Sequence, residues 1–220
     1  MKYLTYIQEL QRNFASWHGF PDRIKYHPDV FISAFMMNDR IFKDAPSKIK
    51  ENDEIVAKVL KVNGYNLEHC LERHRMDASM VQLALLSTPM VAKIVDPVFL
   101  NNEDILLRLA KKSGHVFAVR RDCFDDKWFG HQEIMHSAIE NSPLVFQIAS
   151  AKYRSNYQNC LHACIKFAGN YQFVEAKIKE KHPDLAELVV QANPKLIKYI
   201  PDNIKNSPDF ILKQQLMERG

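Results

Sequence analysis

The chain is poor in the features from which linkers and membrane spans are built. It has six glycines among 220 residues and no low-complexity run. Little of it could form a flexible linker, so we expect one domain over residues 1–220. No apolar run approaches the roughly 18–20 residues that a bilayer span requires. Residues 1–20 mix charges with Gln and Asn, which does not resemble a signal peptide.

Cysteine is also scarce, and its spacing matches neither a disulfide framework nor a zinc site. The four cysteines follow no framework pattern, which is typical of a reducing compartment, and we predict a cytoplasmic protein. Cys160, His162 and Cys164 come closest to a metal cluster, but a fourth ligand and a C-x-x-C pair are missing. We therefore favour buried cysteine packing there, and we expect no metal and no cofactor. Cys70 is also predicted to be buried, whereas Cys123 is expected in a loop where a thiol could react.

Motifs of catalysis are missing as well. The sequence contains no G-x-S-x-G, no H-E-x-x-H, no phosphate-binding glycine loop and no paired-carboxylate motif. Its nine histidines are scattered, and several stand at expected helix starts or turns. We predict that the protein is not an enzyme.

A short helical unit recurs along the chain. Residues 52–70 combine a polar helix start, a short apolar helix, a glycine and a second short apolar helix. Apolar residues at offsets 0, +1, +4 and +5 from Ile55 would share one stripe of a helix. The same four offsets are apolar from six further anchors, which are Phe31, Met80, Ile105, Ile134, Cys160 and Leu185.

Glycine or proline follows six of these anchors by nine residues and marks the expected second helix. These residues are Gly64, Pro89, Gly114, Pro143, Gly169 and Pro194. We expect Gly to end one helix with a positive φ and Pro to open the next. A fixed period of about 25 residues with fixed punctuation is typical of stacked helical repeats. We predict an all-α protein, a solenoid or compact superhelix of short antiparallel helix pairs. The first helices should start near residues 28, 52, 77, 102, 131, 157, 182 and 207.

Both ends of the chain are predicted to cap the repeats, which occupy residues 27–206. Residues 1–26 contain a candidate capping helix with apolar residues at spacings of three and four. Residues 207–220 place Gln214 and Gln215 where other repeats have apolar stripe residues. Such a change suits a terminal repeat that has no neighbour on one side.

The same unit resembles an uncharacterised repeat family, classed as a domain of unknown function, with an N-D-x-E-x-V-x-x-A-V-x-x-x-G-x-x-L-x-x-A rhythm. The resemblance covers about residues 28–214. It implies an α-helical array, no known activity, and occurrence in bacteria and some of their viruses and hosts. The matching residues are Asn52, Asp53, Glu54, Val56, Gly64, Leu67 and, with Cys in place of Ala, Cys70, and a weaker echo lies at Asn102, Asp104, Leu106 and Gly114.

One repeat is longer than its neighbours. From Gly114 to the next first-helix start at His131 there are 17 residues by subtraction. Insertions in repeat proteins form loops, often on the binding face. Two interpretations are open: the inserted Trp-Phe pair covers a widened joint between repeats, or it is an exposed anchor for a partner. The predicted binding residues are Arg120, Arg121, Asp125, Asp126, Trp128 and Phe129.

Basic residues recur around the expected helix ends. Stacking could align some of these groups into a ridge. They are Arg73 with His74 and Arg75, Lys111 with Lys112, Arg120 with Arg121, Lys152 with Arg154, Lys177 with Lys179 and Lys181, and Lys195 with Lys198. The net charge of +4 permits an acidic partner without requiring one. We predict a non-catalytic protein-binding module, a bacterial or phage inhibitor or adaptor that docks on a larger protein. The alternative is nucleic-acid binding through an aligned basic face.

Overall fold

The computed structural model describes residues 2–217, and in that part of the chain helices are the only regular elements. The all-α prediction is confirmed. The chain divides into two compact units, residues 1–105 and 106–220, and the boundary falls inside helix α8. A single repeat domain and a solenoid over the whole chain stay predictions.

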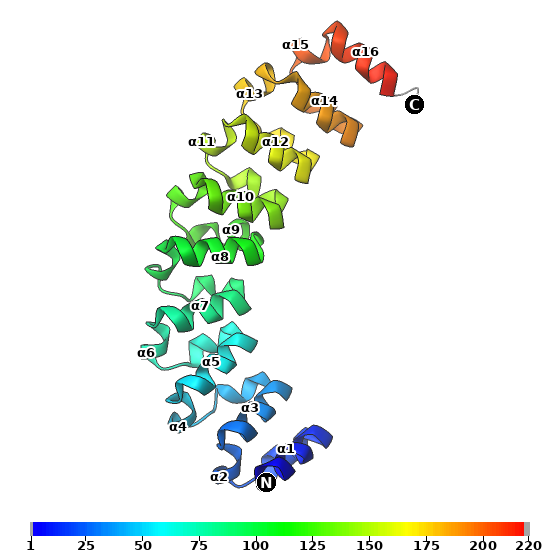
Figure 1. Cartoon of the computed structure of the whole chain (residues 1–220). Helices are drawn as coiled ribbons and strands as arrows, with labels where there is room; N and C mark the ends of the chain where they lie inside the picture. The colour runs from blue at the N-terminus through cyan, green and yellow to red at the C-terminus, as the bar shows by residue number, and fades with distance from the viewer. Residues whose placement is uncertain (1, 218–220) are drawn as a thin grey trace. The chain divides into compact units, whose positions relative to one another are not determined.

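Long helices follow one another side by side within each unit (Figure 1). In the first unit α3 packs against α1 and α5, and α5 packs against α7. In the second unit α12 packs against α10 and α14, and α14 packs against α16. Helices this short are not stable alone, so each depends on burying its apolar stripe against its neighbours. The long helices are α1 (Lys2–Arg12), α3 (Pro28–Met37), α5 (Asp53–Val62), α7 (Ala78–Ser87), α8 (Glu103–Ser113), α10 (Gln132–Asn141), α12 (Tyr157–Lys166), α14 (Pro183–Ala192) and α16 (Pro208–Met217).

The predicted pair of α-helices is wrong in the second half of most repeats, where a 3-10 helix follows the long helix. A single extended residue ends the long helix and begins a 3-10 helix. At Asn63, for example, φ is −145° and ψ is 106°, and its side chain accepts a bond from the Tyr65 N–H. The 3-10 helices are η1 (Phe14–Gly19), η2 (Asp39–Phe42), η3 (Gly64–His69), η4 (Pro89–Lys93), η8 (Pro143–Ile148), η9 (Ala168–Phe173) and η10 (Pro194–Tyr199).

A short α-helix then completes most repeats, so a repeat has three helical parts rather than two. The regular short helices are α2 (Asp22–Lys25), α4 (Ser47–Lys50), α6 (Glu72–Arg75), α11 (Ala151–Arg154), α13 (Ala176–Lys181) and α15 (Asp202–Lys205). The repeats around α8 are less regular and contain η5 (Phe99–Asn101), α9 (His115–Val119), η6 (Arg121–Cys123) and η7 (Asp126–Gly130).

The buried stripes follow all four predicted offsets in α5, α8, α10 and α14. In α7 three of the four are buried and Met80 is half-buried. In α3 and α12 the buried set is shifted by one residue, to start at Val30 and Asn159, and leaves Met36 63% and Ile165 61% exposed. The predicted full burial is therefore wrong for Met80, Ile32, Met36, Leu161 and Ile165. With the first anchor moved to Val30, the anchors 30, 55, 80 and 105 are 25 residues apart by subtraction.

The glycines act through close packing and not through a positive φ. Among the described residues no glycine has a positive φ, which corrects that prediction. A methyl group on Gly64 would lie 2.2 Å from the carbonyl oxygen of Ala84 in the next repeat. A methyl group on Gly114 would lie 2.0 Å from the carbonyl oxygen of Ala138. Only glycine allows the backbone of one repeat to approach the next long helix so closely.

The N-terminal segment departs from its prediction as a capping helix. Residues 2–26 contain a long helix, a 3-10 helix and a short helix, in the order found later in the chain. Asn13 separates the first two, and its side chain accepts a bond from the Ala15 N–H.

The C-terminal segment carries the polar residues expected of a cap, but apolar residues as well. In α16 Gln215 is exposed and Gln214 is half-buried. Ile211, Leu212 and Leu216 are exposed too. Residues 218–220 of the predicted cap lie outside the described residues.

We predict that Gly64→Ala lowers the free energy of unfolding by at least about 2 kcal/mol, because the added methyl group overlaps backbone that cannot move independently. Gly19→Ala is the matched control, since no atom lies within 4 Å of the methyl group it would add. That variant should stay within about 0.5 kcal/mol of the parent. Urea unfolding measures both, and equal stabilities would show that close packing at Gly64 is unimportant.

Candidate binding surfaces

The inserted segment buries the two aromatic residues that were predicted to bind a partner. Trp128 is 6% exposed and Phe129 is 1% exposed. Phe117 contacts the edge of the Phe129 ring and stacks on Phe124, with ring centroids 6.4 and 4.6 Å apart. The Phe129 carbonyl accepts a hydrogen bond from the Ser150 N–H at 2.7 Å. The interpretation of this pair as an exposed anchor is therefore wrong. The two aromatic side chains pack inside the second unit.

The charged residues of the insertion bond chiefly to one another. Arg120 pairs with Asp122 at 2.7 Å, and the Arg121 guanidinium pairs with Asp126 and covers the Phe129 ring. Asp125 lies 3.8 Å from the Lys127 ammonium. Asp125 and Asp126 are exposed, and the two arginines are half-buried. Their role in binding a partner stays a prediction.

A groove lies between α12 and α14 in the second unit, and we call it the α12–α14 groove. It has a volume of about 590 Å³. Ile165 is 61% exposed and Phe167 is 45% exposed. Solvent exposure of large apolar side chains beside a hollow is typical of an interaction site. The groove is lined by Cys164, Ile165, Lys166, Phe167, Ala168, Gly169, Leu188, Gln191, Ala192 and Asn193.

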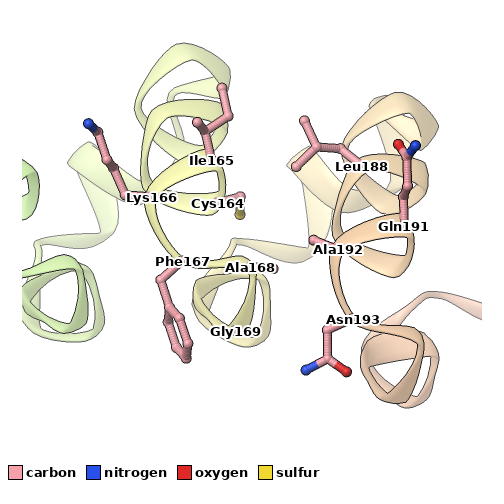
Figure 2. Close-up of a pocket in the computed structure, with 10 residues that line it drawn as sticks. All are labelled: Cys164, Ile165, Lys166, Phe167, Ala168, Gly169, Leu188, Gln191, Ala192 and Asn193. Carbon is pink, nitrogen blue, oxygen red and sulfur yellow. The ribbon is translucent and has the colours of Figure 1, made fainter.

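The walls of the groove come from the C-terminal halves of two long helices. Figure 2 shows Leu188 and Ala192 of α14 pointing toward α12, whereas Lys166 points to the opposite side of α12. The Lys166 ammonium pairs with Glu140 of α10, which accounts for this direction. The side chains that face the groove from α14 are therefore apolar, and the Gln191 and Asn193 amides lie at its border (Figure 2).

Four titratable side chains form a second cluster, on the flank of α10 and α12. The His136 and His162 rings stack with centroids 3.8 Å apart. Nε2 of His162 lies 2.8 Å from a carboxylate oxygen of Glu140, and Lys166 pairs with the other oxygen. We call these residues the His–Glu cluster. They link neighbouring repeats through polar contacts.

Three members of this cluster are also possible metal ligands. One ligand atom each of His136, Glu140 and His162 lies within 4.8 Å of the others. Lys166 already neutralises the carboxylate, however, and the imidazole rings lie nearly parallel, with an interplanar angle of 18°. Metal ligands instead converge on one point. In this arrangement both carboxylate oxygens of Glu140 are already bonded, one to Lys166 and one to His162.

Burial and neighbouring charges shift the pKa values of two cluster residues. The pKa of His136 is lowered from 6.5, first by burial and then by the charge of His162. The pKa of Glu140 is lowered from 4.5, because its carboxylate accepts hydrogen bonds from Lys166 and His162. Both folded-state pKa values lie below the unfolded values, so the free energy of unfolding is greater at neutral pH than in acid.

The cysteines lie as the sequence predicted. Cys70, Cys160 and Cys164 are buried, whereas Cys123 is partly accessible. Burial raises the pKa of each of the three buried thiols to about 12. Those three cannot form thiolate at neutral pH.

The sequence predicts neither the groove nor the His–Glu cluster as a site. Its apolar spacing places Ile165 in the buried stripe, and its histidines follow no motif. A usable signal existed, because His136 and Glu140 are four residues apart on one helix and His162 follows about one repeat later. The signal for the groove was Phe167, an aromatic residue outside the stripe.

Comparison with known proteins gives no family to which the chain could be assigned. No family model, no curated protein and no solved structure matches it. The resemblance to a repeat family of unknown function stays a prediction. Each helix within residues 2–217 is too short or too polar to span a bilayer.

We predict that one thiol of the native protein reacts with Ellman's reagent at pH 8 within minutes, and that this thiol is Cys123. All four should react in denaturant. Cys123→Ser should abolish the fast reaction and leave the unfolding midpoint unchanged. Fast reaction of two or more thiols in the folded protein would contradict the burial of the other three.

We predict that acid weakens the link between α10 and α12. Because the folded pKa of His136 lies below its unfolded value of 6.5, the unfolded chain binds the proton first as the pH falls. Between pH 7.5 and 5.5 the parent should lose about 1–2 °C more in melting temperature than His136→Gln. His115→Gln, which changes another exposed histidine, is the control and should behave as the parent does.

Proposed function

We propose that this chain is a non-catalytic protein-binding module that docks on a larger protein as an adaptor or inhibitor. The observation that carries the proposal is the α12–α14 groove, with Ile165 and Phe167 exposed beside it. Exposed apolar surface lowers solubility, so a protein retains it at a defined hollow chiefly where a partner covers it.

The groove fits an apolar segment of a partner. Its floor contains small residues, Cys164, Ala168 and Gly169, so side chains of a partner can approach closely. Leu188 supplies an aliphatic wall, and the amides of Gln191 and Asn193 can bond to the partner's backbone. An amphipathic helix carrying Leu or Phe at spacings of three and four matches these features.

The titratable groups that lie together support binding rather than catalysis. In the His–Glu cluster Glu140 is shared by Lys166 and His162. A general base needs to be free to accept a proton from a substrate. Glu140 and His162 do not line the groove. Lys166 does, but its ammonium points away from the groove (Figure 2).

We predict that Ile165→Asp combined with Phe167→Ser abolishes partner capture and leaves folding intact, because both side chains are exposed. The immobilised chain is incubated with nuclease-treated lysate, and bound proteins are quantified by mass spectrometry. At least one protein should be retained tenfold more by the parent than by this variant, which corresponds to about 1.4 kcal/mol. Melting temperatures should agree within about 2 °C.

The matched control is Met36→Asp with Met37→Ser. It removes two exposed apolar residues at the end of α3, outside the groove. This control should retain the same protein. Equal retention by the parent and the groove variant would overturn the proposal. Equal loss in both double variants would show non-specific adhesion rather than a site.

A further inference from the structure

The short helices carry a repeated pair of basic residues, one of which has a structural role. The second and fourth residues are basic in five of them: Arg23 and Lys25, Lys48 and Lys50, Arg73 and Arg75, Lys152 and Arg154, and Lys177 and Lys179. The residue between them is apolar or aromatic in all but α6, where it is the buried His74.

The fourth residue stabilises the end of the preceding 3-10 helix. The Lys25 ammonium donates to the His18 carbonyl at 3.2 Å, and the Lys50 ammonium donates to the Lys43 carbonyl at 2.8 Å. The Lys179 ammonium donates to the Gln172 carbonyl at 3.4 Å. Arg154 differs, because it donates to the Phe173 carbonyl at the end of the 3-10 helix that follows it, at 3.1 Å. Cations are favourable at helix C-termini, where carbonyl groups lack partners. This position is explained by the fold.

In α11 and α13 the second residue has no such role. Lys127 of η7 and Lys152 and Lys177 of these two short helices are exposed and 25 residues apart by subtraction. The Lys127 ammonium lies 3.8 Å from Asp125 and over the Trp128 ring, whereas the side chains of Lys152 and Lys177 form no hydrogen bond or ion pair with any residue that the structure describes. We call Lys127, Lys152 and Lys177 the basic column.

Two hollows connect the members of the column. Lys127 and Lys152 line a hollow of about 440 Å³ together with Ser150. Lys152 and Lys177 line the next hollow, of about 600 Å³, together with Lys181. Because Lys152 borders both, the three lysines lie in sequence along one edge of the second unit, where Figure 1 shows α11 and α13 on the same side.

The acidic residues of these hollows are already neutralised. Asp126 lines the first hollow and pairs with Arg121. Glu175 lines the second hollow and lies 3.5 Å from Arg154. Lys152 and Lys177 therefore present uncompensated positive charge at the repeat period, and Lys127 continues the series at the first hollow.

We infer that the basic column binds the phosphate backbone of double-stranded nucleic acid without reading its sequence. Lysine acts as a point charge on phosphate, and evenly spaced like charges suit a periodic polyanion. No exposed aromatic residue lines either hollow, so the stacking platform for single strands and the aromatic anchor of protein interfaces are both missing there.

The test uses the full chain and a fluorescein-labelled 20-base-pair DNA duplex, with Kd measured by anisotropy from 50 to 200 mM salt. The variant is Lys127→Gln, Lys152→Gln and Lys177→Gln together. The control is Lys111→Gln, Lys112→Gln and Lys195→Gln, which removes the same charge from exposed positions outside the hollows.

We expect the column variant to bind at least tenfold more weakly at 100 mM salt. Its slope of log K against log salt should fall by about 1.8, since Lys152 and Lys177 would each neutralise one phosphate and each contributes about 0.9 to the slope.

Three results would overturn the inference. The first is no binding by the parent at 50 mM salt, and the second is equal weakening in the column and control variants. The third is a poly-glutamate chain that competes as well as the duplex does, which would identify an acidic protein as the partner. The inference is independent of the proposed protein-binding groove, because Ile165→Asp with Phe167→Ser should bind the duplex as the parent does.

Discussion

Close backbone contact between successive repeats is the constraint on which this architecture depends. At Gly64 and Gly114 the start of one repeat's second half lies against the long helix of the next, at Ala84 and Ala138. The Gly64 N–H, buried by this contact, donates to the Thr88 hydroxyl at 2.9 Å. Where proline opens the 3-10 helix, as in η4, η8 and η10, that position has no N–H that needs a partner.

The same constraint explains why the second half of a repeat is a 3-10 helix followed by a short α-helix. A tighter, shorter element fits beside the next long helix, but it leaves carbonyl groups without partners at its end. Lysine side chains of the short helices donate to those carbonyls, as Lys50 does to Lys43. The basic residue at the fourth position of the short helices therefore has a structural role. The basic residue at the second position of α11 and α13, which belongs to the basic column, is not required by the fold.

The sequence predicted the helical class, and it predicted the starts of the long helices from α3 onward to within one residue. These follow from apolar spacing and helix caps, which are local. It misplaced the stripe of α12 because Asn159 is polar. The structure buries Asn159, and its side-chain amide bonds to Gln132 at 2.7 and 3.1 Å and to the Tyr153 carbonyl at 3.1 Å. Such pairing depends on residues six and 27 positions away, which a periodic pattern does not reveal. The spacing of His136 and Glu140 and the aromatic Phe167 are local signals for the cluster and the groove, but the contact of Glu140 with His162 and the hollow beside Ile165 depend on packing between long helices.

The corrected register also shows which apolar positions of the long helices are not required for packing. Ile165 stands six residues after its stripe anchor, a position that Lys61, Lys111 and Glu140 occupy in other repeats with their side chains exposed. Since polar residues serve there, packing does not require an isoleucine. An apolar side chain at a position that the repeat leaves to solvent costs solubility and adds little to the core. That cost is why we place the binding surface at Ile165 and Phe167 and not at the inserted segment, whose aromatic residues the second unit buries for its own stability.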